Sequence, residues 1–352
     1  MSVTVTPLKI LYIGGSGTIS ASCVRLSVAQ GMQVFILNRG NNVSGRQLPE
    51  SVVHLLGDIT SPSSVTAALG DLQFDAVVNF LCFTADDAAR AVEIFRSRTR
   101  HYIHISSASV YRKPILQVPL VESNVRENRF LQYAREKIAA EDVFLNAHRH
   151  DGFPVTIVRP SHTYDEASPP LPGGWTVFSR IERGADIVVH GDGTSLWTLT
   201  HAADLATGLV GLLANHRAIG EAFHITSDDV YTWDQIYSLV GDSLGIPAKL
   251  VHVPSEYFPL AAPDWMWSEL IVGDLSHSAV FDTSKIRRYV PDYAPRRTFA
   301  RTVIEMARLR QENPGTTPAD AASDAVMDRL ASGYHEARAV FEQLAPAPSG
   351  AR

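Results

Sequence analysis

The chain has 352 residues, of which 45% are hydrophobic and 19% are charged, a composition typical of a globular protein with a large core and two domains. Its net charge of -6 offers no broad basic field, which disfavours nucleic acid as a partner. Its two cysteines are too few for a disulfide framework, which favours a reducing compartment. The N-terminal MSVTVTP lacks the pattern of a signal peptide and no run of about 20 apolar residues occurs, so we expect a cytoplasmic protein without a membrane segment.

The first predicted unit is a strand, a glycine turn and a helix. The apolar run 10–13 ends at Gly14-Gly15, and a helix is expected over 18–30, closed by Gly31. This arrangement directs backbone N–H groups and the positive end of the helix dipole toward one point, which suits a pyrophosphate. Because a single glycine motif also occurs in turns that bind no ligand, this turn alone leaves both interpretations open.

The next predicted strands, 34–37, 52–56 and 75–81, end in candidate cofactor residues. Asn38 stands where a carboxylate would bind the ribose of NAD, and Arg39 can instead pair with the 2′-phosphate of NADP. We therefore favour NADP, although Arg39 also fits a solvated turn. Asp58 either covers the adenine or is a turn residue, and Cys82 is expected to be a packed thiol.

A fifth strand, 102–106, continues into Ser-Ser-Ala-Ser-Val-Tyr, and a long helix is expected over 127–148. Within this helix, Tyr133 and Lys137 are four residues apart and share one face. Alternation of strands and helices at this spacing predicts an α/β fold with a doubly wound parallel Rossmann sheet and a smaller C-terminal α/β lobe. His104, inside the strand, is expected to be a core residue.

Five motifs in order resemble the extended short-chain dehydrogenase/reductase superfamily, in its NAD(P)-dependent epimerase/dehydratase branch. They are GGSGTIS, SSASVY, Tyr133-x-x-x-Lys137, VRPSHTY and GDGTSLWTLTHAADLA. The resemblance implies an enzyme with NAD or NADP as cofactor. Three departures concern Ser20 in place of a glycine, Arg112 where glycine is usual, and the run 162–165, His-Thr-Tyr-Asp, in place of Asn-Val-Tyr-Gly.

The resemblance also assigns candidate site residues. The expected catalytic residues are Ser107, Tyr133 and Lys137. The expected cofactor-binding residues are Gly14, Gly15, Ser16, Gly17, Thr18, Ile19, Asn38, Arg39, Asp58, Ile59, Phe80, Leu81, Cys82, Tyr133, Lys137, Pro160 and Ser161. The expected substrate-binding residues are Phe83, Ser107, Ser109, His162, Thr163, Tyr164 and Trp175. No metal ligands are expected.

The remaining chain is predicted to alternate between the two lobes. A strand is expected over 187–190, a helix capped by Asp204, a last strand of the main sheet over 222–226, and a helix capped by Thr232. Trp265 and Trp267 are candidates for a substrate wall, at least one of them packing a helix. We assign 1–165 with 201–227 to the dinucleotide-binding domain, 166–200 with 228–315 to the substrate lobe, 316–344 to a C-terminal helix and 345–352 to a disordered tail.

The predicted chemistry is removal of a hydroxyl proton by Tyr133 as hydride leaves the same carbon, giving a ketone. Because the reference pKa of tyrosine is about 10, the Lys137 ammonium is needed to favour the phenolate. Related sugar dehydratases carry Asp-Glu where this chain has Ala108-Ser109, so we favour epimerisation of a sugar, nucleotide-sugar or nucleoside-like substrate. Dehydration with His162, Asp165 or Glu166 as acid, a carbonyl reductase or alcohol dehydrogenase, and a redox-sensing or RNA-associated NAD(P)-binding protein remain alternatives. A homodimer is compatible with this assignment.

Overall fold

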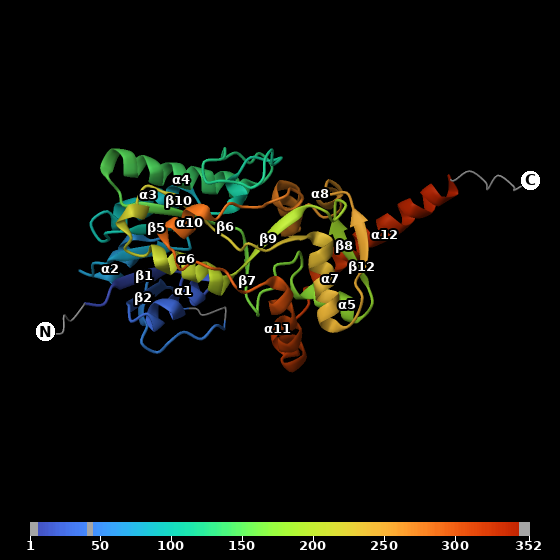
Figure 1. Cartoon of the computed structure of the whole chain (residues 1–352), viewed down its shortest axis with the longest axis horizontal. Helices are drawn as coiled ribbons and strands as arrows, with labels where there is room; N and C mark the ends of the chain where they lie inside the picture. Colours follow the sequence, from blue (N-terminus) through green and yellow to red (C-terminus); the bar gives the residue numbers. More distant parts are fainter. Residues whose placement is uncertain (1–5, 41–44, 345–352) are drawn as a thin grey trace, which may run out of the picture. The chain divides into compact units, whose positions relative to one another are not determined.

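The computed structural model describes residues 6–40 and 45–344, which divide into two compact units. The first unit contains an all-parallel sheet of seven strands in the order β10-β6-β5-β4-β1-β2-β3 (Figure 1). Its strands are nearly all buried and apolar, as expected for a parallel sheet covered on both faces. The strands are β1 (Lys9–Ile13), β2 (Gln33–Asn38), β3 (Val53–Leu56), β4 (Ala76–Asn79), β5 (Tyr102–Ile105), β6 (Val155–Pro160) and β10 (Ala222–Ile225).

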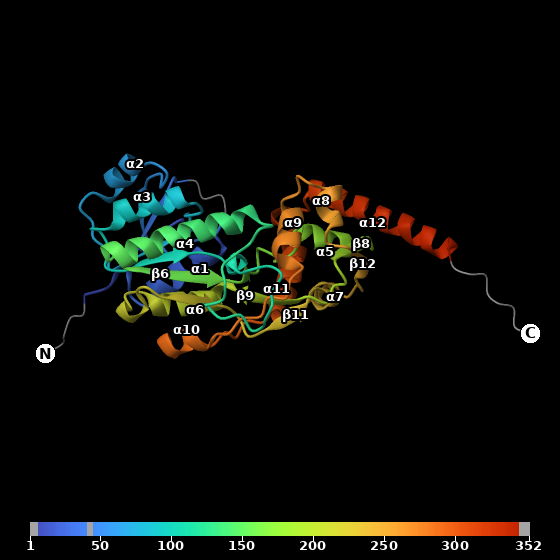
Figure 2. The same ribbon diagram turned by 90° about the horizontal axis from the view of Figure 1, so that it is seen from above.

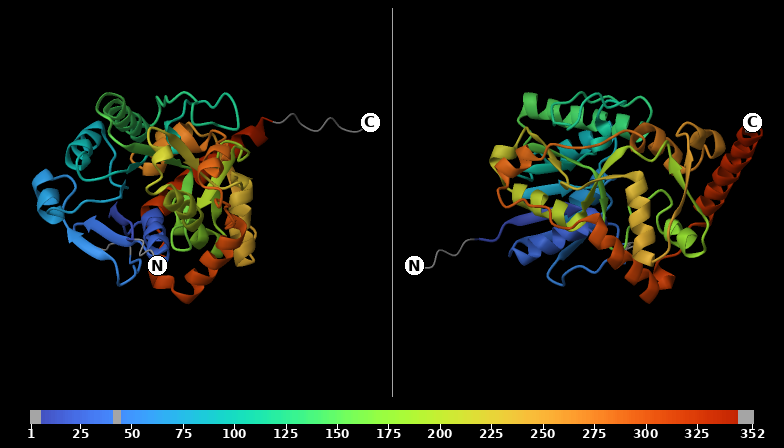
Figure 3. Two further views of the ribbon diagram at one scale, coloured as in Figure 1. Left: turned by 60° about the vertical axis from the view of Figure 1, so that its left-hand side comes forward. Right: turned by 45° about the vertical axis from the view of Figure 1, so that its right-hand side comes forward.

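Helices cover both faces of this sheet and form two separate hydrophobic cores. One core includes α1 (Thr18–Ala29), α6 (Ala202–Leu212) and α10 (Ser284–Tyr289), and the other includes α2 (Pro62–Leu69), α3 (Ala85–Phe95) and α4 (Gln132–Asp151). Figures 2 and 3 show α4 and α6 on opposite sides of the sheet. The predicted doubly wound parallel sheet is therefore confirmed. The short helices η1 (Ala108–Val110) and η2 (His216–Ala218) complete the unit.

Two predicted helix starts are wrong. Helix α4 begins at Gln132 rather than 127, because Asn128 is buried and its side chain accepts hydrogen bonds from the backbone N–H groups of Phe130 and Leu131. Helix α6 is capped by His201, whose Nδ1 accepts from the Ala203 N–H at 3.0 Å. Asp204 instead accepts from the backbone N–H groups of Arg296 and Arg297. The ends of both helices depend on these local hydrogen bonds.

The units differ in extent from the predicted domains. Of the described residues, the first unit comprises 6–40, 45–165, 198–230 and 279–299, and the second comprises 166–197, 231–278 and 300–344. We assigned 279–299 to the substrate lobe, but α10 in this segment packs against β10 and α6 of the first unit. The predicted tail, 345–352, lies outside the described residues. In the first unit β7 (His162–Tyr164) pairs in parallel with β9 (Leu196–His201). The chain passes from one unit to the other within β9 and again within β11 (Val230–Thr232).

The second unit is built on a parallel strand pair, β8 and β12, against which the last helix, α12, packs. The predicted cap at Thr232 is confirmed, since its hydroxyl accepts from the Gln235 N–H at 3.2 Å. Trp265 has a packing role, because its ring is buried and its Nε1 donates to Ser323 at 2.9 Å. The elements are α5 (Trp175–Glu182), β8 (Asp186–His190), α7 (Trp233–Leu244), β12 (Lys249–Val253), α8 (Tyr257–Ala261), α9 (Met266–Leu270), the π-helical η3 (Ile271–Leu275), α11 (Phe299–Glu312), η4 (Pro314–Thr316) and α12 (Ala321–Gln343).

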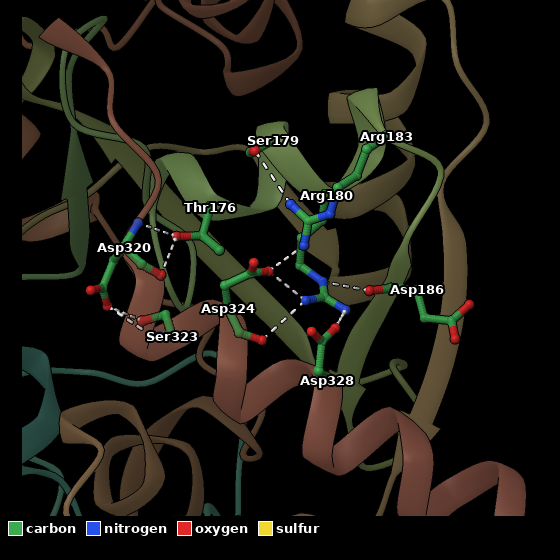
Figure 4. Close-up of polar contacts among 9 residues, drawn as sticks. All are labelled: Thr176, Ser179, Arg180, Arg183, Asp186, Asp320, Ser323, Asp324 and Asp328. Carbon is green, nitrogen blue, oxygen red and sulfur yellow. Dashed lines mark hydrogen bonds and ion pairs between the residues drawn. The ribbon is translucent and has the colours of Figure 1, made fainter. Parts of the chain in front are cut away.

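Charged side chains attach α12 to α5. Arg180 of α5 is buried and pairs with Asp324 at 2.5 Å and Asp328 at 2.7 Å, both on α12 (Figure 4). Arg183 binds Asp324 as well, and Arg180 Nε donates to the Asp186 carbonyl at 2.8 Å. Since a buried guanidinium needs compensating charge, α12 is a required part of this unit. Among the described residues, no helix is long and apolar enough to span a membrane.

Candidate active site

The glycine turn between β1 and α1 is closely packed. Gly14 has a φ of +81°, a conformation that glycine adopts at little cost. A Cβ at Gly15 would lie 2.7 Å from the Ile36 side chain, so this position also requires glycine. Ser20 is buried and its hydroxyl accepts from the Gly17 N–H at 2.8 Å, so serine fits the position where the resemblance implies a glycine. The turn therefore directs the start of α1 toward the carboxyl edge of the sheet.

A groove of about 610 Å³ begins at this turn and follows the carboxyl ends of β2, β3 and β4. Parallel α/β sheets bind nucleotides at this edge. Asn38 accepts from the Gly40 N–H at 2.9 Å, Arg39 is exposed at the rim, and Asp58 accepts from Thr60. The predicted residues that line it are Gly14, Ser16, Gly17, Thr18, Ile19, Asn38, Arg39, Asp58, Ile59, Phe80, Leu81, Phe83 and Thr163. Such a groove fits an extended dinucleotide with its phosphates at the start of α1.

Asp58 has the turn geometry that was one of its two predicted interpretations. Hydrogen bonds from the Thr60 N–H at 2.9 Å and the Thr60 hydroxyl at 2.8 Å hold the pKa of its carboxyl below the ordinary value. Its side chain nevertheless lines the groove, so the turn and the cofactor interpretations are compatible.

A smaller cavity of about 270 Å³ brings the predicted catalytic residues together. Ser107, at the end of β5, and Tyr133 and Lys137, on α4, all line it. Tyr133 is 37% exposed, whereas Lys137 is buried. The cavity is also lined by Ile19, Phe80, Phe83, Pro160, Ser161, His162 and Thr163, several of which also line the dinucleotide groove. The two spaces are therefore neighbours within the first unit.

The Lys137 ammonium is held by backbone oxygens at the ends of two strands. Its Nζ donates to the Cys82 carbonyl at 2.7 Å and to the Ile105 carbonyl at 2.9 Å. It lies 4.5 Å from the Phe83 ring centre and 5.7 Å from the Tyr133 ring centre. Burial lowers the pKa of Lys137 to about 8, so the group is charged at neutral pH but loses its proton at mildly alkaline pH.

Ser109 is held by the neighbouring, predicted catalytic serine. Its side chain is buried, and its hydroxyl shares a 2.8 Å hydrogen bond with the Ser107 hydroxyl. The Ser109 N–H also donates to the Ser107 oxygen at 3.1 Å. Ser109 lines neither the groove nor the catalytic cavity, and its contact with substrate stays a prediction.

Three other predicted site residues line neither the groove nor the catalytic cavity. Tyr164 is buried, with its ring against His201 and Phe299, so it does not line the cavity. The Cys82 side chain is buried, as expected for a packed thiol, and burial raises its pKa to about 12. Its carbonyl oxygen accepts a hydrogen bond from Lys137. Trp175 begins α5 in the second unit, where its ring packs 4.9 Å from Phe178, and its part in substrate binding stays a prediction.

Asp165 was a candidate acid, but its carboxylate is bound by Arg46. The Arg46 Nε and Nη2 atoms donate to its two oxygens at 2.8 and 2.9 Å, and Nη2 also donates to Thr18 at 3.1 Å. The sequence did not predict the role of Arg46. It also did not predict Thr60 and Asp87 as site residues, although both line the groove. For Asp87 a signal existed, because Thr84-x-x-Asp87 is a capping-box pattern that fixes the first turn of α3 after β4.

Comparison with known proteins agrees with this geometry. A sequence model of the NAD dependent epimerase/dehydratase family matches residues 10–226, which contain the groove and the catalytic cavity. The chain belongs to this family. The resemblance inferred from the motifs is thereby confirmed, and with it an enzyme of the extended short-chain dehydrogenase/reductase type.

Relatives of this family member differ in the reaction that their names describe. The chain is 28% identical over 331 residues to 2′-dehydrokanamycin reductase from Streptomyces kanamyceticus, covering 92% of this chain and 91% of that protein. An epimerase from Methanothermobacter thermautotrophicus has a similar fold, with a TM-score of 0.72, 18% identity and coverage of 88% of this chain and 94% of its own. So does dTDP-glucose 4,6-dehydratase from Bacillus anthracis in complex with NAD, with a TM-score of 0.71, 16% identity and coverage of 88% and 98%.

Proposed function

We propose that this family member interconverts a secondary alcohol and a ketone on a sugar-type substrate, with a nicotinamide dinucleotide as hydride carrier. The observation that carries the proposal is the cavity that joins Ser107, Tyr133 and Lys137 next to a dinucleotide-sized groove. When bound, the cofactor supplies or accepts hydride. The side chains of this protein supply everything else, which is binding, orientation and proton transfer.

Each side chain has a distinct proposed role. Tyr133, partly exposed in the cavity, exchanges the hydroxyl proton with the substrate. The buried Lys137 ammonium favours the phenolate of Tyr133 through its charge. Ser107 donates a hydrogen bond to the reacting oxygen, and its bond to Ser109 limits its rotation. His162 lines the same cavity and is proposed as a hydrogen-bonding contact to the substrate.

For the cofactor, we propose a preference for NADP within this NAD-dependent family. Asn38 and the exposed Arg39 line the groove at the end of β2, where an aspartate or glutamate would bind a free ribose 2′-hydroxyl. Neither an amide nor a guanidinium at that place repels a 2′-phosphate, as a carboxylate would. A guanidinium also binds phosphate through paired hydrogen bonds.

Dehydration is the least supported reaction. Ala108 has no ionisable group, Ser109 is directed at Ser107, and the Asp165 carboxylate is bound by Arg46. Elimination of water needs an acid or base beyond Tyr133, and none of these positions supplies one, which leaves His162 in the catalytic cavity and Glu166 as the candidates for that reaction. We therefore keep epimerisation as the favoured reaction. Net reduction of a ketone is a second candidate, because the relative that covers 92% of the chain is named a reductase.

An isotope experiment separates these reactions. The purified protein is incubated with NADP or NAD and with UDP-glucose, UDP-glucuronic acid, dTDP-glucose or kanamycin, each deuterated at the carbon to be oxidised. Epimerisation keeps the deuterium in a product of unchanged mass, whereas dehydration removes the mass of one water. The reductase candidate predicts that 2′-dehydrokanamycin or another keto-sugar is reduced with net consumption of NADPH or NADH. The proposed function would be contradicted if none of these substrates took part in hydride transfer and the protein bound neither dinucleotide.

A further inference from the structure

Glu141 is a fully buried carboxylate on the same face of α4 as the predicted catalytic pair. Its side chain is 0% exposed. Tyr133, Lys137 and Glu141 are spaced by four residues each, so they follow one another along one side of the helix. A charged side chain in this position is costly unless it is paired and hydrogen-bonded, and its partners therefore carry information.

The partners of Glu141 come from the segments around the catalytic cavity. The Ser106 hydroxyl, next to Ser107 at the end of β5, donates to Oε1 at 2.5 Å. Arg159 of β6 donates from Nε to Oε1 at 2.9 Å and from Nη2 to Oε2 at 2.6 Å. Arg126 donates to Oε2 at 2.9 Å. Glu141 thus links α4 to the end of β5, to β6 and to the segment before α4.

Arg159 extends the linkage to the segment that follows Ser107. Its guanidinium is buried, and Nη1 donates to the Tyr111 hydroxyl and the Glu122 carbonyl, each at 2.8 Å. The Tyr111 hydroxyl in turn lies 2.5 Å from Nε2 of His224. Although burial favours the neutral acid, the Arg159 hydrogen bonds hold the pKa of Glu141 below its ordinary value, so the pair is ionised.

Stability alone does not explain a buried pair of this kind. Removing two charges from water costs free energy, and well-packed apolar side chains of similar volume often stabilise a protein as much or more. What an ion pair with directional hydrogen bonds adds is a single fixed geometry. Here that geometry fixes Ser106, Tyr111 and Glu141, which flank Ser107 and Lys137 in the sequence.

We propose that Glu141 and Arg159 are positioning residues that hold Ser107, Tyr133 and Lys137 in one arrangement for hydride and proton transfer. This inference rests on the proposed function. Glu141 fixes the rotation of α4 and hence the reach of Lys137 to the carbonyls of Cys82 and Ile105. Through Ser106 and Arg159 it also fixes the strand end and the turn on either side of Ser107.

The carboxylate also acts on Lys137 through its charge. Burial disfavours the ammonium, while the carboxylates of Glu141 on the same helix and Asp87 on α3 favour it. Two further groups near Lys137 are His104 of β5 and Arg159 of β6. His104 is neutral, because burial and the charges of Lys137 and Arg159 hold its pKa well below the ordinary value. Removal of the Glu141 charge leaves Arg159 as an uncompensated cation, which further disfavours a protonated Lys137.

The test compares wild type with Glu141→Gln, which keeps the shape of the side chain and removes its charge. Turnover and the titration of Lys137 are followed together, the second by NMR of the lysine 15Nζ signals, with Lys137→Met to assign the signal. We expect kcat per folded molecule to fall by about a hundredfold, the loss that a misplacement of about 1 Å can cause, with a smaller change in the dinucleotide Kd. We also expect Lys137 to lose its proton at lower pH than in wild type. Glu141→Asp, which keeps the charge, should recover part of kcat.

Two further variants keep the test decisive. Ser106→Ala removes a single hydrogen bond to Glu141, so it should fold even if Glu141→Gln does not, and kcat should fall in the same direction by a smaller factor. Asp324→Asn removes a charged partner from the buried Arg180 in the second unit and should lower Tm without changing the Lys137 titration. Full kcat with an unchanged Lys137 titration in folded Glu141→Gln or Ser106→Ala would overturn the positioning role. A wild type that binds no dinucleotide, with the Lys137 titration still shifted in Glu141→Gln, would contradict the proposed function alone.

Discussion

Arg46 and Asp165 are 119 residues apart in the chain, and the Arg46 guanidinium binds both carboxylate oxygens of Asp165. The side chains are only 15% and 8% exposed. Arg46 lies between β2 and β3, and Asp165 directly follows β7, so the pair joins two loops at the carboxyl edge of the sheet.

We predict that Asp165→Ala lowers the free energy of unfolding by about 3 kcal/mol, because it leaves a largely buried guanidinium without its partner. Urea unfolding measures the change. As a control, Asp151→Ala breaks an Arg96–Asp151 pair whose side chains are 52% and 45% exposed, and it should cost at most about 1 kcal/mol. If kcat of folded Asp165→Ala fell by several orders of magnitude while its stability stayed unchanged, Asp165 would be an acid or base after all.

Tyr133→Phe should abolish turnover while dinucleotide binding survives. The substitution removes only the hydroxyl that exchanges a proton with the substrate, and the ring can keep its place beside Phe83, 6.5 Å away between ring centres. Steady-state kinetics and a calorimetric titration with NADP measure the two properties. A variant that kept a substantial share of wild-type turnover would show that Tyr133 is not the proton-exchanging group.

Arg39→Ala should weaken NADP binding more than NAD binding, because an arginine at the end of β2 has a 2′-phosphate to pair with only in NADP. Loss of one exposed charge-assisted contact corresponds to roughly a tenfold rise in Kd for NADP. Calorimetry with both dinucleotides decides the matter. Equal losses for both, or a wild type that prefers NAD, would leave Arg39 as a solvated turn residue.

Turnover in the direction of alcohol oxidation should decline above about pH 8. The pKa of Lys137 is lowered to about 8 by burial, so the ammonium is present below that pH and is lost above it. The pH dependence of kcat/KM at saturating dinucleotide measures this. The residual activity of Lys137→Met should lack the alkaline decline. A wild-type profile that is level to pH 10 would mean that the charge of Lys137 is not required.

Stability should fall on mild acidification. Burial lowers the pKa of His101, aided by His216, and that of His190, each to about 4. The unfolded chain therefore binds more protons than the folded one between about pH 6.5 and 4, and folding free energy is lost as pH falls through this range. Each group should cost about 2 kcal/mol between pH 7 and pH 5. His190→Gln, which keeps a donor for the Leu275 carbonyl, should show a shallower slope, and an unchanged slope would contradict this assignment.

The parts of the fold that could be predicted depend on neighbours in the sequence. The apolar runs that become β1, β4 and β5 and the four-residue spacing of Tyr133 and Lys137 are local patterns. They predicted the succession of strands along the chain and the shared helix face of Tyr133 and Lys137. Ser107 and Lys137 line one cavity because Ser107 follows β5 and Lys137 of α4 binds carbonyls that follow β4 and end β5, and parallel strands end at a common edge.

What could not be predicted depends on partners distant in the chain. The Glu141–Arg159 pair and the Arg46–Asp165 pair join segments whose side-chain contacts no periodicity reveals. Asp204 is an example. An aspartate near a helix start is expected to cap the helix, and the sequence does not reveal that its carboxylate instead accepts from the distant Arg296 N–H. The return of 279–299 to the first unit has the same origin, because the apolar face of α10 matches β10 and α6 only in three dimensions.

The dependence of Arg180 on α12 has a consequence during synthesis of the protein. Arg180 leaves the ribosome 144 residues before Asp324, and its other carboxylate partner, Asp328, follows still later. Until then its guanidinium can remain hydrated only if α5 stays out of its final packing. The second unit is therefore expected to complete its folding only after α12 has emerged, whereas every strand of the seven-stranded sheet has emerged by residue 225. A nascent chain would thus hold a largely assembled dinucleotide-binding sheet before its second unit is closed.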